Sequence, residues 1–252
     1  MIICLCVVIL VLLILFIFKM NTEIKKNESV SLSNNVINEI RKQQLQNKVK
    51  LDTKYKKDDI KFIHITKTAG TTIENIGKEH GYNWGKYDRN YLEKFKKLKK
   101  FAHNNPWHIP LQYFTTNPYK DKILFTVVRN PYSRCISEYY CPWTGNKNQN
   151  ASVEEFNKWI QHKLTQNDIV SFLPYSEYFS YNNEIIINYI LYFENLEQEF
   201  NHLFGNVKLD RHENKSMYFK KYDIHDLDRT TIRMINDKYK KHFNLFKYKM
   251  MS

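Results

Sequence analysis

The sequence predicts an α/β domain of three layers around a central parallel sheet. Short apolar, β-rich segments occur at residues 61–65, 122–128 and 185–193. A turn and a segment with helical features follow each of them. Alternating strands and helices form a parallel sheet, because each helix carries the chain back to the start of the next strand. The order of strand, turn and helix is that of P-loop-like folds, in which ligands bind at the carboxyl edge of the sheet.

An apolar segment without charges precedes this domain at residues 2–18. As a helix it would be about 26 Å long at ~1.5 Å per residue, which just spans a thin bilayer. A cleaved signal peptide has a shorter apolar core, and small residues precede its cleavage site. We therefore expect residues 1–19 to be an uncleaved transmembrane signal anchor, residues 20–57 to be a stem and residues 58–252 to be the main domain.

Two features of the sequence predict opposite sides of the membrane for the domain. Lys19, Lys25 and Lys26 follow the apolar segment, and the positive-inside rule would keep such a flank, with the domain, in the cytoplasm. Three acceptor triplets for N-glycosylation suit a lumenal domain instead. These triplets begin at Asn27, Asn150 and Asn214.

The stem is polar and contains no glycine. Its apolar residues Val36, Ile37, Ile40 and Leu51 are only loosely at helical spacing. This pattern favours a partly helical stalk. A short coil that forms a homo-oligomer is the alternative.

The chain is basic, with 39 Lys and Arg against 26 Asp and Glu and a formal net charge of +13. This charge predicts an anionic partner, such as nucleic acid, anionic lipid, a polyphosphorylated cofactor or an anionic glycan. Cys135 and Cys141, the cysteines of the domain, have neither the pattern of a disulfide framework nor the spacing of zinc ligands. The sequence also lacks a His-Glu-x-x-His pattern and a calcium loop, so we expect no metal.

The turn after the first strand has the residues of an anion-binding loop. It consists of Lys67, Thr68, Ala69, Gly70, Thr71 and Thr72, and a helix begins near Ile73. Gly70 lets the backbone approach a ligand, the threonines add hydroxyl donors, and Lys67 adds a positive charge beside the helix N-terminus. The lysine precedes the glycine, so this is not the loop of nucleoside triphosphatases, which ends in Gly-Lys-Ser/Thr. Taken alone, the turn can also be an ordinary helix cap.

A second anion site is predicted where the second strand ends. Arg129 follows the strand, Pro131 suits the first turn of a helix, and Ser137 lies about two turns into that helix. Arg129 and Ser137 can therefore face one crevice at the carboxyl edge of the sheet and hold a phosphate. An isolated arginine at this place can instead cap the helix or pair locally.

The remaining elements continue the alternation. Ser152 and Glu155 form a capping-box pattern that opens a helix extending to Leu164. The third strand is followed by a helix expected at residues 196–204. A last helix is expected near residues 230–246, where it packs outside the sheet.

The two anion segments together resemble the signatures with which the Golgi-type carbohydrate sulfotransferases bind 3′-phosphoadenosine 5′-phosphosulfate (PAPS). The resemblance rests on residues 66–72 and 129–139 and covers about residues 61–248. It continues through residues 107–110, 192–196, 212–216 and 239–248. It implies the sulfotransferase fold for residues 58–252, PAPS as co-substrate, no nucleic-acid partner, and a type II membrane protein with its catalytic domain in the lumen of the Golgi or ER.

The same resemblance implies roles for the anion-binding residues. The loop from Lys67 to Thr72 would hold the 5′-phosphosulfate, and Arg129 with Ser137 would hold the 3′-phosphate. Lys67 is the candidate for stabilising the leaving phosphate, because negative charge develops there in the transition state. The family usually has Pro before this lysine and Gly-Gly after Lys-Thr, whereas this chain has Thr66 and Ala69-Gly70. The alanine leads us to expect that position 69 avoids positive φ.

The base that accepts the proton of the acceptor hydroxyl is expected between the two signatures. Histidine suits this task because its ordinary pKa lies near neutrality. His108 matches the corresponding segment of similar enzymes better than His103 does. Glu74 and Glu138 are alternative bases, and His64 is expected to be structural because it lies in the first strand.

The resemblance suggests a glycan acceptor, such as a uronic acid or hexosamine polymer, with a tyrosyl protein as the less favoured acceptor. Four tryptophans can stack on sugar rings or fill the core. They are Trp84, Trp107, Trp143 and Trp159. A membrane-anchored glycan-binding protein without catalysis is the alternative function. A kinase is disfavoured, since metal-binding carboxylates beside the loop and a Walker-type loop are both missing from the sequence.

Overall fold

The computed structural model describes residues 35–46, 50–89, 104–148, 150–166, 169–211 and 221–252. The predicted membrane anchor, His103 and the triplets at Asn27 and Asn214 lie outside these residues. Within the described part of the chain, no helix combines the length and apolarity needed to cross a membrane. The described residues from Ile40 to Ser252 form one compact unit.

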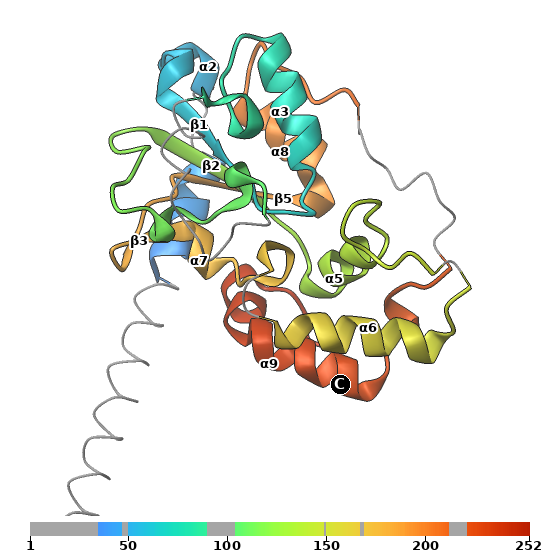
Figure 1. Cartoon of the computed structure of the whole chain (residues 1–252). Coiled ribbons are helices and arrows are strands. Elements are labelled where there is room, and N and C mark those ends of the chain that lie inside the picture. The colour runs from blue at the N-terminus through green and yellow to red at the C-terminus, as the bar shows by residue number, and fades with distance from the viewer. Residues whose placement is uncertain (1–34, 47–49, 90–103, 149, 167–168, 212–220) are drawn as a thin grey trace, which may run out of the picture. The chain divides into compact units, whose positions relative to one another are not determined.

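A parallel sheet of three strands lies at the centre of this compact unit, in the order β1-β2-β5 (Figure 1). The strands are β1 (Ile60–Ile63), β2 (Ile123–Val128) and β5 (Tyr189–Tyr192). Phe62 pairs in register with Phe125, which in turn pairs with Tyr189. Because neighbouring strands run parallel, their carboxyl ends meet at one edge of the sheet. The predicted central parallel sheet is confirmed.

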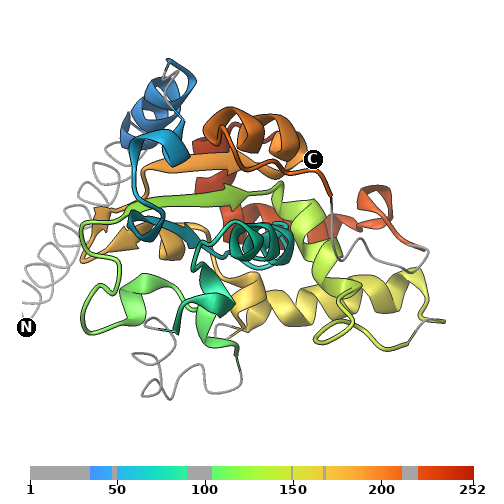
Figure 2. The same ribbon diagram turned by 90° about the horizontal axis from the view of Figure 1, so that it is seen from above.

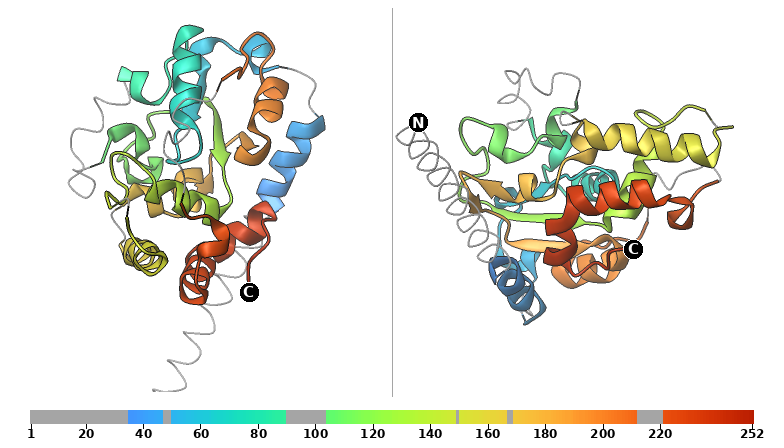
Figure 3. Two further views of the ribbon diagram at one scale, coloured as in Figure 1. Left: turned by 90° about the vertical axis from the view of Figure 1, so that its right-hand side faces the viewer. Right: turned by 90° about the horizontal axis from the view of Figure 1, so that it is seen from below.

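Helices cover both faces of this sheet. Two views show α3 (Gly70–Glu79), which follows β1, and α8 (Leu196–Leu203), which follows β5, on opposite sides of β2 (Figures 2 and 3). Ile73 of α3, Phe125 of β2 and Phe200 of α8 are each fully buried in one hydrophobic cluster. The apolar faces of the two helices thus close over a sheet that is itself apolar on both sides, as expected for parallel strands.

A second hydrophobic cluster forms among three helices beyond the carboxyl edge of β2. They are α5 (Pro131–Tyr139), α6 (Val153–Thr165) and α9 (Arg229–Phe246), which lie side by side in Figure 1. The buried side chains of Tyr132, Phe156 and Phe243 belong to this cluster. The predicted capping box of α6 is present, since Ser152 Oγ accepts from Glu155 N at 3.2 Å and Glu155 Oε2 accepts from Ser152 N at 2.7 Å.

The third strand is shorter than predicted. The segment 185–193 contains the end of a small antiparallel hairpin, β3 (Ser180–Tyr181) with β4 (Glu184–Ile185), and then β5. Asn182 and Asn183 form the hairpin turn with φ of 50° and 67°. Two central residues with positive φ are typical of type I′ turns, in which asparagine is favoured. Apolar composition alone does not reveal that the chain changes sheets between Ile185 and Tyr189.

Residues assigned to the stem from the sequence take part in the compact unit. Arg41, in the helical segment at residues 35–46, pairs with Glu199 at 2.9 Å, and Gln44 Oε1 accepts from Ile190 N at 3.1 Å. Leu51 in α2 (Leu51–Lys54) is 1% exposed and packs in the cluster around the sheet. The folded domain therefore includes these residues, and the Gln44 amide satisfies an edge N–H of β5.

Candidate functional site

The loop after β1 joins the strand to α3 with two left-handed residues. Lys67 has φ 66° and Ala69 has φ 68°, and Gly70 is the first residue of α3. The first N–H groups of a helix have no intrahelical acceptor and carry partial positive charge, which favours an anion. None of the ion pairs among the described residues uses the Lys67 ammonium. The loop therefore places a half-buried lysine beside the N-terminus of α3.

Two residues of this loop differ from their sequence-based assignment. The expectation that Ala69 avoids positive φ is wrong. Thr68 is fully buried and its hydroxyl donates to the Ile65 carbonyl at 2.7 Å, so this hydroxyl is engaged within the loop rather than presented as a donor. Gly70 also has a packing role, since a Cβ at this position would lie 2.1 Å from His64 Nε2.

The strain at Ala69 gives a stability prediction. A non-glycine residue in the left-handed region costs about 1–2 kcal/mol, which glycine does not incur. We expect Ala69→Gly to raise the free energy of unfolding by about 1 kcal/mol, after part of the gain is offset by the larger entropy of glycine in the unfolded chain. Denaturant unfolding of the two chains measures the difference. Thr71→Gly, inside the helix, is the control and should destabilise the protein, and a destabilised Ala69→Gly chain would contradict the strain argument.

Arg129 connects the two predicted anion sites. Its Nη1 donates to the Lys67 carbonyl at 3.1 Å, its Nε donates to Ser133 Oγ at 3.0 Å, and its guanidinium lies 3.9 Å from the centre of the Phe193 ring. Burial lowers the pKa of this guanidinium, although Tyr175 and Glu194 act against the shift. A guanidinium has five N–H donors, so these two hydrogen bonds leave others for an anion.

Ser137 lies on the side of α5 that Arg129 reaches. Ser133, which Arg129 contacts, is four residues earlier, and residues four apart lie on the same face of a helix. Ser137 is half-buried, and none of the side-chain hydrogen bonds found in the described segments uses its hydroxyl. Arg129 thus contacts the face of α5 on which Ser137 also lies.

Arg134 is a residue that sequence reasoning missed. It is 1% exposed and donates to the carbonyls of Thr66, at 3.2 Å, and Leu173, at 2.8 Å. Its guanidinium also lies 4.7 Å from the centre of the Tyr175 ring. Through these contacts α5 holds the backbone just before Lys67 in place. The signal available in the sequence was its position on the buried face of α5, five residues after Arg129.

His108 ends a short 3₁₀ helix, Pro106–His108, and its ring meets the ring of His64 edge to face with centroids 4.4 Å apart. Desolvation, together with the nearby His64 and Lys67, holds the pKa of His108 well below its ordinary value. A histidine in this state is neutral at pH 7 and can accept a proton. The base predicted from the sequence therefore lies near the predicted lysine.

The two glutamates considered as alternative bases are both buried. Glu74 is fully buried and its Oε1 lies 2.6 Å from His64 Nδ1. Glu138 is 2% exposed, and its Oε1 accepts a hydrogen bond from the Thr144 hydroxyl. His64, expected to lie in the strand as a structural residue, instead follows β1 and contacts both Glu74 and His108.

A loop after α5 brings Cys141 near Lys67, and the same loop carries Trp143. Gly145 N donates to the Cys141 carbonyl at 2.9 Å, which closes the loop tightly. Burial and Glu138 raise the pKa of the Cys141 thiol, but Lys67 and hydrogen bonds from Thr144 outweigh them and the pKa is lowered overall. Trp143, at the tip, is 84% exposed, whereas Trp84 is fully buried.

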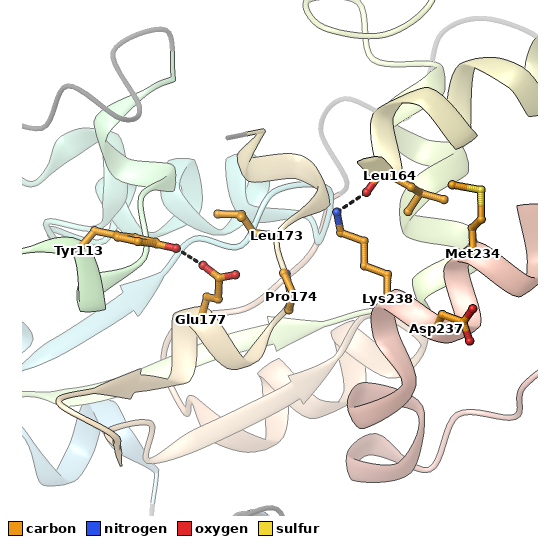
Figure 4. A pocket seen from close by; sticks show the side chains of 8 residues that line it. All are labelled: Tyr113, Leu164, Leu173, Pro174, Glu177, Met234, Asp237 and Lys238. Atoms are coloured by element: carbon orange, nitrogen blue, oxygen red, sulfur yellow. Dashed lines mark hydrogen bonds between the residues drawn. The ribbon is translucent and has the colours of Figure 1, made fainter. Parts of the chain in front are cut away.

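An open groove of about 470 Å³ lies near α7 (Ser176–Phe179), the C-terminal end of α6 and the middle of α9 (Figure 4). Tyr113 donates to Glu177 on one side, and Lys238 Nζ donates to the Leu164 carbonyl at 2.6 Å on the other. No predicted site residue lines the groove, and the carboxylates of Glu177 and Asp237 disfavour an anion there. The groove is therefore separate from the anion site.

No group of three or more metal-ligating side chains occurs within the described segments.

The family model described as "Sulfotransferase family" matches residues 53–249 of the chain. No curated protein and no solved structure matches it.

Proposed function

The chain belongs to the sulfotransferase family, and from that premise we propose that it transfers a sulfuryl group from PAPS to a hydroxyl group of a glycan. The observation that carries the proposal is the hydrogen bond from Arg129 Nη1 to the Lys67 carbonyl, 3.1 Å long. It brings the two anion-binding segments together at the carboxyl edge of adjacent parallel strands. PAPS has a 5′-phosphosulfate and a separate 3′-phosphate, so it requires two such segments.

We assign the 5′-phosphosulfate to the loop from Lys67 to Thr72 and the 3′-phosphate to Arg129 and Ser137. In the reaction, the acceptor oxygen forms a bond to sulfur while the bond from sulfur to the phosphate oxygen breaks. The proton of the acceptor hydroxyl goes to His108, and Lys67 stabilises the negative charge that develops on the departing phosphate. The chemistry uses protein side chains and PAPS alone.

A transfer experiment tests this function. The full-length chain would be incubated with ³⁵S-labelled PAPS and a panel of uronic acid and hexosamine polymers, with a tyrosyl peptide as the alternative acceptor. Calorimetry with adenosine 3′,5′-bisphosphate, and with ADP as the matched nucleotide without a 3′-phosphate, measures the cofactor site. We expect transfer to a glycan and preference for the bisphosphate. The absence of both transfer and bisphosphate binding would overturn the proposed function. Transfer to the peptide alone would overturn the assignment of a glycan as the acceptor.

The exposed Trp143 supports a sugar acceptor, since pyranose rings stack their C–H faces on indole. Trp143→Ala should raise the KM for the glycan about tenfold, because aromatic stacking contributes about 1–1.5 kcal/mol. The affinity for the bisphosphate and the thermal stability should stay unchanged, as the side chain is 84% exposed. Leu45→Ala, which removes another exposed apolar side chain, is the control. An unchanged KM for Trp143→Ala would exclude this residue from acceptor binding.

A further inference from the structure

A buried carboxylate and imidazole pair lies directly beneath the candidate site. His64 Nδ1 and Glu74 Oε1 are 2.6 Å apart, and the two residues are 6% and 0% exposed. Two glycines make room for the pair: a Cβ on Gly70 would lie 2.1 Å from His64 Nε2, and a Cβ on Gly85 would lie 1.6 Å from Glu74 Oε1. The surrounding backbone is thus shaped to hold this pair.

Burial of this pair lowers the free energy of unfolding, so the pair is not explained by a role in stability alone. Glu74 Oε2 is buried without a hydrogen-bond partner among the described residues. Leaving one oxygen of a buried carboxylate unsatisfied costs about 1–3 kcal/mol. An apolar pair of the same volume would avoid that cost. The retained carboxylate therefore points to a role in the site beside it.

The pair reaches that site through one contact. The His64 ring meets the His108 ring edge to face, at 79° and with centroids 4.4 Å apart. The charged or titratable groups that influence His108 are His64 and Lys67, and Glu74 faces the far side of His64. A carboxylate bonded to Nδ1 fixes both the orientation and the tautomer of an imidazole.

We propose that Glu74 and His64 are positioning residues for His108. Glu74 orients the His64 ring, and the His64 ring holds His108 where it accepts the proton of the acceptor hydroxyl. The negative charge of Glu74 also offsets the positive charge that appears on the His108 ring after this transfer. The inference rests on the proposed function, and it assigns the sequence-predicted alternative base Glu74 a role that acts through another residue.

A double-mutant cycle tests the proposal in the full-length chain. Glu74→Gln keeps the shape and removes the charge, and should lower kcat about tenfold or more while the KM for PAPS stays within about twofold. In a His108→Ala background the same substitution should change kcat by less than about twofold, because it acts through His108. Additive effects of the two substitutions would overturn the proposal. Asp88→Asn removes another buried carboxylate, ion-paired with Lys61 at 2.8 Å, and should leave kcat unchanged.

Two further measurements keep the test decisive. If Glu74→Gln does not fold, His64→Gln replaces it in the double-mutant cycle with His108→Ala, because the glutamine keeps an amide donor toward Glu74. His64→Gln should lower kcat about tenfold or more alone and by less than about twofold in the His108→Ala background. A nuclear magnetic resonance measurement of the imidazole signals does not depend on turnover. Glu74→Gln should shift the ring signals of His108 as well as those of His64, and unchanged His108 signals would overturn the contact. Shifted His108 signals without any sulfuryl transfer would instead show that the proposed function fails while the contact stands.

Discussion

Replacement of Lys67 by alanine should lower kcat for sulfuryl transfer about 100-fold or more. The ammonium is the positive charge that the loop after β1 presents next to the N-terminus of α3. A charge-assisted hydrogen bond that strengthens as the phosphate departs contributes a few kcal/mol to the transition state, and about 1.4 kcal/mol corresponds to a factor of ten. The ground state of PAPS carries less charge at that oxygen, so its binding should suffer less than the rate.

The measurement is the initial rate of ³⁵S transfer at saturating PAPS. Calorimetry measures the affinity for the bisphosphate product in parallel. We expect the product to bind Lys67→Ala within about tenfold of the wild-type affinity, since Arg129 and the backbone amides remain. Lys122→Ala is the matched control. Lys122 lies just before β2, at the opposite edge of the sheet, and pairs with Asp59 at 2.8 Å. A kcat within about threefold of wild type for Lys67→Ala would contradict the assigned role.

Features of the fold with local causes could be predicted from the sequence. Arg129 follows an apolar strand and precedes Pro131, so its place at the carboxyl edge of the sheet depended only on adjacent residues. The capping box of Ser152 and Glu155 is likewise set within one helical turn. The convergence of Lys67 and Arg129 follows from the parallel pairing of β1 with β2, which the alternation of strands and helices already indicated.

Features that depend on distant parts of the chain could not be predicted in this way. Arg134 is satisfied by the carbonyl of Leu173, which lies 39 positions later in the chain. The contact between His64 and Glu74 requires α3 to cross the end of β1 at one particular rotation, and no local pattern specifies that rotation. Ala69 adopts positive φ because the loop must enter α3 above the His64 ring, although alanine itself disfavours that conformation.

Replacement of His108 by alanine should lower kcat about 100-fold to 10,000-fold, the usual contribution of a general base. The pH dependence separates this role from a structural one. Desolvation, His64 and Lys67 hold the pKa of His108 well below its ordinary value, so the neutral base is fully present at pH 7. Activity should be lost only as the pH falls through that depressed pKa, and the acid limb of the kcat profile should therefore lie below about pH 6.5.

In His108→Ala this acid limb should disappear, and added imidazole should restore part of the rate because it supplies a base to the vacated position. Binding of the bisphosphate should stay unchanged, since His108 acts on the acceptor side of the reaction. His225→Ala is the control, because His225 is an exposed histidine in a separate short helix, Ile224–Asp226. An acid limb that persists in His108→Ala, with a kcat near that of wild type, would show that another group takes the proton. Loss of the limb together with rescue by imidazole identifies His108 as the base, since a purely structural histidine would yield neither result.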